Sequence, residues 1–235
     1  MCFLAVLMFA GLLEEGLRLS EAGRWAEARE KFAAATQAEP SNGLAWKALG
    51  VASGRLNDLA AAEEAFREGC QQAPKTPDLC YFHARSLYTM NRFIPAISAL
   101  KAQLPTDPQP ARIWLALGQA QEAASQPKEA ELSFQSALKL QPRSPDARHR
   151  FAVFLYRVGR LAEAQTELEA ALAADPKYAP AHAELGRVYY QQGKLPQAIQ
   201  HLEASAASIE WAGLLLEKAR RRLRLTAPPA AAAGP

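Results

Sequence analysis

Residues 179–205 read APAHAELGRVYYQQGKLPQAIQHLEAS and set the pattern for the rest of the chain. If Ala179 is position 1 of a unit, small residues stand at position 8 (Gly186) and position 20 (Ala198), and the apolar Leu202 stands at position 24. Gly193 at position 15 suits a left-handed helix end. The stretch therefore predicts two helices joined by a turn.

The same pattern recurs five times upstream at a fixed spacing of 34 residues. Position 20 is always alanine, at Ala28, Ala62, Ala96, Ala130, Ala164 and Ala198. Position 8 is always small, at Gly16, Gly50, Ala84, Gly118, Ala152 and Gly186. Position 24 is always a large apolar residue, at Phe32, Phe66, Leu100, Phe134, Leu168 and Leu202. A constant period of this length indicates a helical repeat architecture.

The spacing has a physical cause. Small residues on both helices allow the two backbones to approach closely, and the large residue at position 24 fills the groove beside them. Position 15 is glycine or asparagine in every unit except the fourth, where Ser125 departs and Pro127 can open the next helix. Proline ends the second helix at position 32 in five units, at Pro40, Pro74, Pro108, Pro142 and Pro176.

Further positions carry a family resemblance. Tryptophan stands at position 4 in Trp46 and Trp114, leucine at position 7 in Leu49, Leu117 and Leu185, and alanine at position 27 in Ala35, Ala137 and Ala171. Together with the positions above, they resemble the tetratricopeptide repeat (TPR) family from about Phe9 to Trp211. The departures are Arg148 and His182 at the tryptophan position, His83 at the leucine position, Gln103 at the third small position and Glu210 in place of the last proline.

This resemblance implies an all-α, right-handed superhelical solenoid of about six helix-turn-helix repeats with a C-terminal capping helix. The repeats are assigned to residues 9–42, 43–76, 77–110, 111–144, 145–178 and 179–212, and the third is the least regular. Residues 213–225 are assigned to the capping helix and residues 226–235 to a disordered tail.

Residues 1–13, MCFLAVLMFAGLL, are strongly apolar but too few for a confident membrane span. We interpret residues 1–8 as an extension of the first helix, or as a remnant signal or anchor. The third interpretation is a truncated start, in which earlier repeats are missing. No Lys or Arg precedes the apolar run, and the cleavage site is poor, which weighs against a signal peptide.

The charge is unevenly distributed along the chain. The net charge is +3, and five bases lie between Lys218 and Arg224; without them the balance is 22 basic against 24 acidic residues. We read this run as the solvent-facing side of a capping helix. Contact with an anionic membrane surface or with RNA is the alternative, and nucleic acid is the less favoured partner.

The sequence shows no catalytic or metal-binding motif, and we expect neither an enzyme nor a cofactor. His149 and His182 are near one repeat apart, but no third ligand accompanies them. Cys70 and Cys80 fall at positions 28 and 4, which face neighbouring helices, and we read them as buried free thiols.

By resemblance to TPR proteins, positions 2, 5, 9, 12 and 13 of the first helices point into a concave groove. The predicted groove residues are Lys47, Arg55, Tyr81, Arg85, Tyr88, Arg112, Gln119, His149, Tyr156, Arg157, Arg187 and Tyr190. Cations and tyrosines suit an extended or helical peptide with acidic residues. The carboxylate clamp of some TPR proteins is incomplete, because Val51 stands where asparagine is needed beside Lys47.

We therefore expect a non-enzymatic scaffold or adaptor that binds a partner protein or peptide and no small-molecule substrate. The alternative is a membrane-attached or exported accessory subunit of a cell-envelope complex that uses the apolar N-terminus for membrane contact. The sequence favours the cytoplasm slightly and leaves export or membrane association through residues 1–13 open.

Overall fold

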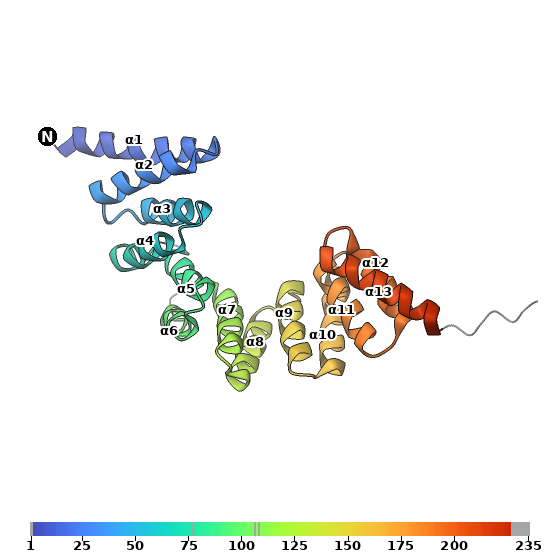
Figure 1. Cartoon of the computed structure of the whole chain (residues 1–235). Helices are drawn as coiled ribbons and strands as arrows, with labels where there is room; N and C mark the ends of the chain where they lie inside the picture. The colour runs from blue at the N-terminus through green and yellow to red at the C-terminus, as the bar shows by residue number, and fades with distance from the viewer. Residues whose placement is uncertain (1, 77, 106, 108, 227–235) are drawn as a thin grey trace, which may run out of the picture. The chain divides into compact units, whose positions relative to one another are not determined.

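The computed structural model describes residues 2–76, 78–105, 107 and 109–226, without the side chains of residues 2–10 and 226. These residues form helices joined by short turns, and no strand occurs among them (Figure 1). The predicted all-α repeat fold is confirmed. The helices are α1 (Cys2–Glu21), α2 (Trp25–Ala38), α3 (Gly43–Arg55), α4 (Leu59–Gln72), α5 (Leu79–Thr89), α6 (Phe93–Gln103), α7 (Pro110–Ala123), α8 (Pro127–Leu140), α9 (Pro145–Arg157), α10 (Leu161–Ala174), α11 (Ala179–Gln191), α12 (Leu195–Ala206) and α13 (Glu210–Thr226).

The chain divides into two compact units, residues 1–130 (unit 1) and 131–235 (unit 2). In unit 1, each helix from α1 to α6 packs on the helix that follows it. In unit 2, the helices from α9 to α13 do the same. The first helices of successive repeats, which we call A helices, also contact one another: α1 with α3, α3 with α5, and α5 with α7 in unit 1, and α9 with α11 in unit 2. The side chains that these helices expose therefore form one surface in each unit.

The close approach within each helix pair occurs at the predicted positions. A Cβ atom added to Gly16 would lie 2.5 Å from Phe32 Cε1, one added to Gly50 would lie 2.6 Å from Phe66 Cζ, and one added to Gly186 would lie 2.6 Å from Leu202 Cγ. Each clash is between position 8 and position 24 of one repeat. The alanines at position 20 are buried, with 4% exposure or less. Glycine at position 8 therefore lets the large side chain lie directly against the neighbouring helix.

The turn between the two helices has the same backbone in all six repeats. Position 15 has a positive φ at Gly23, Asn57, Asn91, Ser125, Gly159 and Gly193. The expected departure at Ser125 is therefore confined to its side chain, because its φ of 59° matches those of the two asparagines. The left-handed residue reverses the chain at each helix end.

Position 4 joins neighbouring repeats through a hydrogen bond to the proline carbonyl at position 32 of the preceding repeat. Trp46 Nε1 donates to Pro40 O at 2.8 Å. Where the tryptophan is missing, Arg148 Nε donates to Pro142 O at 3.0 Å and His182 Nε2 donates to Pro176 O at 3.0 Å. The two departures from the family pattern thus retain the N–H group that makes this contact.

The third repeat makes a different connection at position 4. Cys80 forms a disulfide with Cys70 at position 28 of the preceding repeat, with the two Cα atoms 4.8 Å apart. The prediction of free thiols is wrong, because positions 28 and 4 face each other across the contact between α4 and α5. A Cα separation in this range permits a disulfide.

We predict that the disulfide can be counted chemically. A Cys2→Ser chain, denatured and titrated for thiols, should show none before reduction and two after it. Reduction should lower the free energy of unfolding by about 2–3 kcal/mol, the typical gain for a short disulfide loop. A chain that also carries Cys70→Ser and Cys80→Ser should not respond to reductant. Two thiols before reduction, in protein kept from reductants throughout, would contradict the assignment.

Two glycines of α3 provide a matched test of helix packing. We expect Gly50→Ala to lower the free energy of unfolding by about 1–3 kcal/mol, because the added methyl group overpacks the contact with Phe66. Gly54 has open space around it, so Gly54→Ala should raise that free energy by up to about 1 kcal/mol through helix propensity. Denaturant unfolding measures both. Equal effects of the two changes would show that close approach at position 8 does not limit packing.

Candidate protein-binding face

In unit 1, Asp78 ties together the A helices of three successive repeats. Asp78 precedes α5 in a left-handed conformation with φ of 69°. Its Oδ2 lies 3.3 Å from Lys47 Nζ of α3, and its Oδ1 accepts a hydrogen bond from Arg112 Nη1 of α7. The hydrogen bond from Arg112 holds the pKa of Asp78 below its usual range, despite the opposing effect of burial. Two predicted groove cations are thus paired with one carboxylate.

Aromatic rings lie beside the same cations. The Arg112 guanidinium lies 5.0 Å from the Tyr81 ring centre, and the Arg85 guanidinium lies 5.8 Å from the same ring. Arg112 Nη2 also donates to Asp107 Oδ2 at 2.7 Å. The structure therefore brings Lys47, Tyr81, Arg85 and Arg112 together, but acidic side chains already neutralise much of the predicted positive charge.

The other predicted residues of unit 1 lie elsewhere on the A helices. Arg55 is exposed, with its guanidinium 5.4 Å from the Trp25 ring. Tyr88 is 39% exposed and its ring lies 5.4 Å from that of Phe93. Gln119 is half-buried on α7. These three side chains can extend a contact surface without adding to the Asp78 cluster.

In unit 2, Arg187 of α11 lies between two aromatic rings. Its guanidinium is 4.1 Å from the centre of the Tyr156 ring of α9 and 5.4 Å from that of the Trp211 ring of α13. Arg187 Nη2 also lies 2.5 Å from Glu184 Oε2 on its own helix. The alternate helices α9, α11 and α13 thus surround one cation.

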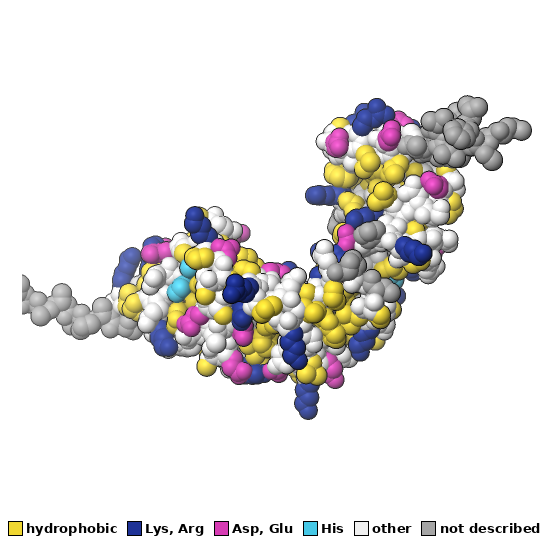
Figure 2. Space-filling view, turned by 180° about the vertical axis from the view of Figure 1, so that it is seen from behind, with side chains coloured by type: hydrophobic (Ala, Val, Ile, Leu, Met, Phe, Trp, Pro, Cys, Tyr) yellow, Lys and Arg dark blue, Asp and Glu magenta, His cyan; other side chains and the backbone are white. Residues whose placement is uncertain are grey.

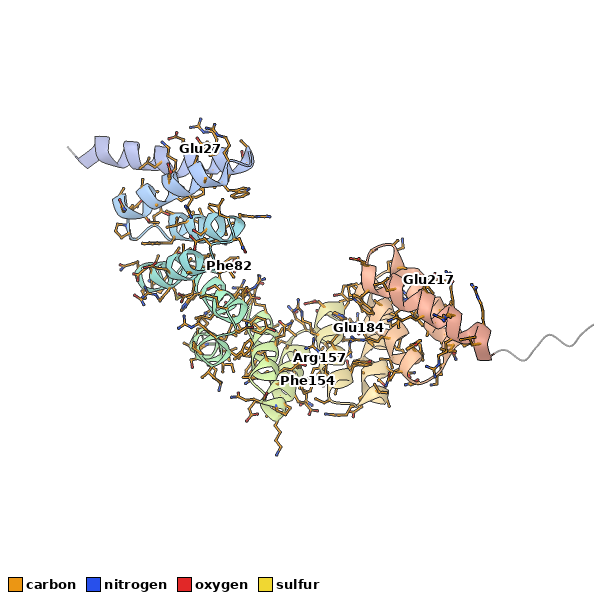
Figure 3. All side chains as sticks on the ribbon, viewed as in Figure 1. Glu27, Phe82, Phe154, Arg157, Glu184 and Glu217 are labelled. Atoms are coloured by element: carbon orange, nitrogen blue, oxygen red, sulfur yellow. A yellow bond between two sulfur atoms is a disulfide. The ribbon has the colours of Figure 1, made fainter. Side chains whose placement is uncertain are left out.

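Glu184 lies beneath this surface. It is 9% exposed, and burial raises its pKa while the charges of Arg187 and Arg157 oppose that rise. Figure 3 shows Arg157 and Glu184 on the neighbouring helices α9 and α11. Glu184 thus places a carboxylate beneath the face, where it pairs with Arg187.

The capping helix extends the same surface. The Arg222 guanidinium of α13 lies 5.4 Å from the Tyr190 ring of α11. The unit 2 face is formed by Tyr156, Arg157, Arg187, Tyr190, Trp211 and Arg222. Trp211, Arg222 and Glu184 are not among the site residues predicted from the sequence. Of these three residues, only Glu184 could have been predicted from the sequence. It stands three residues before Arg187 on the same helix, and this spacing places both side chains on one side of the helix.

His149 is set back against Tyr178. The two rings meet edge to face with centres 5.8 Å apart, and Tyr178 Oη donates to Asp146 Oδ1 at 3.4 Å. Burial lowers the pKa of His149 to about 4; Asp146 raises it, while Arg150 and Arg187 lower it. His149 is therefore neutral near pH 7 and acts mainly through packing.

The described part of the chain contains no group of three or more His, Cys, Asp or Glu side chains that could hold a metal ion. His182 and His201 instead face each other, with their Nδ1 atoms 2.9 Å apart. Charges of both signs are interspersed over the surface visible in Figure 2, with hydrophobic side chains among them.

Pairs of helices stacked in register, with cations and aromatic rings exposed by the A helices, define a helical-repeat scaffold. The chain belongs to the tetratricopeptide repeat family. Residues 89–211 match the family model described as cytochrome c-type biogenesis protein H TPR domain, and residues 13–77 match the tetratricopeptide repeat model. This family is generally a non-catalytic fold that mediates protein–protein interaction.

Solved structures support the same fold. The type IV pilus biogenesis factor PilW is 19% identical with a TM-score of 0.74, over 89% of this chain and 98% of that one. PilF from Pseudomonas aeruginosa is 19% identical with a TM-score of 0.65, over 95% of both chains. A chain of the APC/C hetero-tetramer Cut9-Hcn1 is 19% identical with a TM-score of 0.68, over 90% of this chain and 42% of that one. The present chain thus spans less than half of that protein. Comparison with curated proteins gave no match.

The depressed pKa of His149 predicts a pH dependence of stability. An exposed histidine titrates near 6.5, so the unfolded chain binds more protons than the folded chain between about pH 6.5 and 4. The contribution of neutral, buried His149 to folding stability is therefore complete above this window, and it is lost as the pH falls through the window. Acidification through this window should lower the free energy of unfolding of the wild type by on the order of 2 kcal/mol more than that of a His149→Gln variant. Denaturant unfolding measures both. A His149 resonance that titrates near pH 6.5 in the folded chain would contradict this prediction.

Proposed function

We propose that the chain is a non-catalytic scaffold that binds a segment of a partner protein on the unit 2 face. The observation that carries this proposal is Arg187, held between Tyr156 and Trp211. Tryptophan, tyrosine and arginine are the residue types that contribute most to binding at protein interfaces. Because the helices already fix these side chains, little conformational entropy is lost when a partner binds.

The charge of the unit 2 face supports a preference for acidic partner segments. Arg157, Arg187 and Arg222 all belong to this face, and the buried Glu184 beneath it pairs with Arg187. In unit 1, Asp78 and Asp107 already accept hydrogen bonds from the cations. We therefore assign the acidic-segment site to unit 2.

The names of similar proteins support a role in assembly. The larger family match is to a cytochrome c-type biogenesis protein, and one structural neighbour is titled a type IV pilus biogenesis factor. Both names describe biogenesis. A scaffold that holds one segment of a client chain suits such a role.

A second candidate is an exported or membrane-attached accessory subunit of a cell-envelope complex. The Cys70–Cys80 disulfide favours it, because disulfides persist in oxidising compartments and are rare in the cytosol. In the described part of the chain, no helix is long and apolar enough to cross a membrane. Fractionation of native cells tests this candidate, which requires the chain in the envelope or exported fraction.

The unit 2 face can be tested with matched charge reversals. Arg187→Glu should weaken binding of a captured and then purified partner by about 30-fold, the effect of losing one strong interface contact. Tyr156→Ala should weaken it as well. The control is Arg143→Glu, which makes the same charge change at an exposed loop residue of unit 2 and should alter the Kd less than twofold. Calorimetry gives the Kd, and circular dichroism checks folding.

Lys47→Glu serves as a comparison in unit 1. Equal binding by the wild type and a folded Arg187→Glu chain would refute the unit 2 assignment. A large loss with Lys47→Glu alone would place the site at the Asp78 cluster instead.

A further inference from the structure

The outward side of α13 combines exposed leucines with exposed bases. On the inward side, Ala212, Leu216 and Ala219 are at most 6% exposed against the helices of unit 2. On the opposite side, Leu214 is 64% exposed and Leu225 is 76% exposed. Lys218 and Arg221 stand between these leucines at intervals of four, three and four residues, which places all four on one side of a helix.

The last turns of α13 have little protein around them. α13 has 17 residues and α12 has 12, so α13 is longer by about 7.5 Å at 1.5 Å per residue. Residues 221–225 are all exposed. The C-terminal part of the helix is therefore accessible to a broad surface.

The bases of this segment fall into two groups. Arg220 is held by Glu203 at 2.8 Å and Glu217 at 3.1 Å, and Arg222 lies over Tyr190 on the unit 2 face. Lys218, Arg221 and Arg224 line a shallow open pocket of about 480 Å³ with Arg220, Glu217 and Leu225. Glu217 is the only acidic residue between 217 and 224, against five bases.

We propose that this outward side of α13, formed by Leu214, Lys218, Arg221, Arg224 and Leu225, docks on the surface of an anionic lipid bilayer. The bases complement lipid phosphates and carboxylates. The two leucines can enter the boundary between headgroups and acyl chains when the helix lies in the membrane plane. A nucleic acid would use the bases but would leave both leucines in water, so the pattern favours lipid. The contact is peripheral and independent of the unit 2 face.

Vesicle sedimentation of the full chain tests the proposal. Vesicles with about 30% phosphatidylserine in phosphatidylcholine should bind the wild type, and vesicles of phosphatidylcholine alone should not. Since each base near an anionic surface contributes about fivefold, Lys218→Glu/Arg221→Glu should lose at least about 20-fold in partitioning. Leu214→Ser/Leu225→Ser should also lose at least about tenfold, because two apolar side chains no longer enter the lipid.

The control carries the same charge change at two exposed loop residues of unit 2, Arg143→Glu/Lys177→Glu, and should bind within twofold of the wild type. All substituted side chains are largely solvent-facing, and circular dichroism confirms that each variant folds. Failure to prefer phosphatidylserine vesicles would overturn the proposal, as would an equal loss in the control. The proposal would also be overturned if the Leu214→Ser/Leu225→Ser variant bound vesicles fully and a short oligouridylate displaced the vesicles. That result would indicate a nucleic acid surface instead.

Discussion

The close approach of the two helices in each repeat is the constraint on which the rest of the structure depends. Position 8 is glycine or alanine and position 20 is a buried alanine. Where position 8 is glycine, the side chain at position 24 fills the space that the missing Cβ leaves. Phe32, Phe66 and Leu202 could not lie where they do beside a larger residue. This packing fixes each A helix relative to its partner helix. It therefore also fixes the surface residues that neighbouring A helices present together.

The period of small and large residues was sufficient to predict this fold, because packing at a fixed spacing leaves a direct trace in the sequence. The connections between repeats were harder to predict. Arg148 and His182 looked like departures from the tryptophan position, yet each donates the equivalent hydrogen bond to a proline carbonyl. Cys70 and Cys80 were assigned to neighbour-facing positions, but the sequence did not show that they face each other. Ser125 adopts the left-handed turn although its residue type does not indicate it.

The candidate site could be predicted only at the level of helix positions. Register places Tyr156 and Arg187 on the A helices, but it does not reveal which charges are compensated. Asp78 and Asp107 pair with Lys47 and Arg112 through a loop conformation that residue spacing does not encode. Trp211 joins the unit 2 face because α13 packs beside α11, beyond the last regular repeat. The sequence alone indicates only a solvating cap for this helix, whereas the structure adds its Trp211 and Arg222 side chains to the face.

Hydrogen exchange of the chain with and without a purified partner tests the central claim most directly, because it reports on every helix of unit 2 at once. We expect added protection of amides in α9, α11 and α13, whose side chains form the unit 2 face. Protection of α10 and α12 should change little. Protection confined to α10 and α12, with α9 and α11 unchanged, would show that the partner binds the opposite surface and would contradict the account.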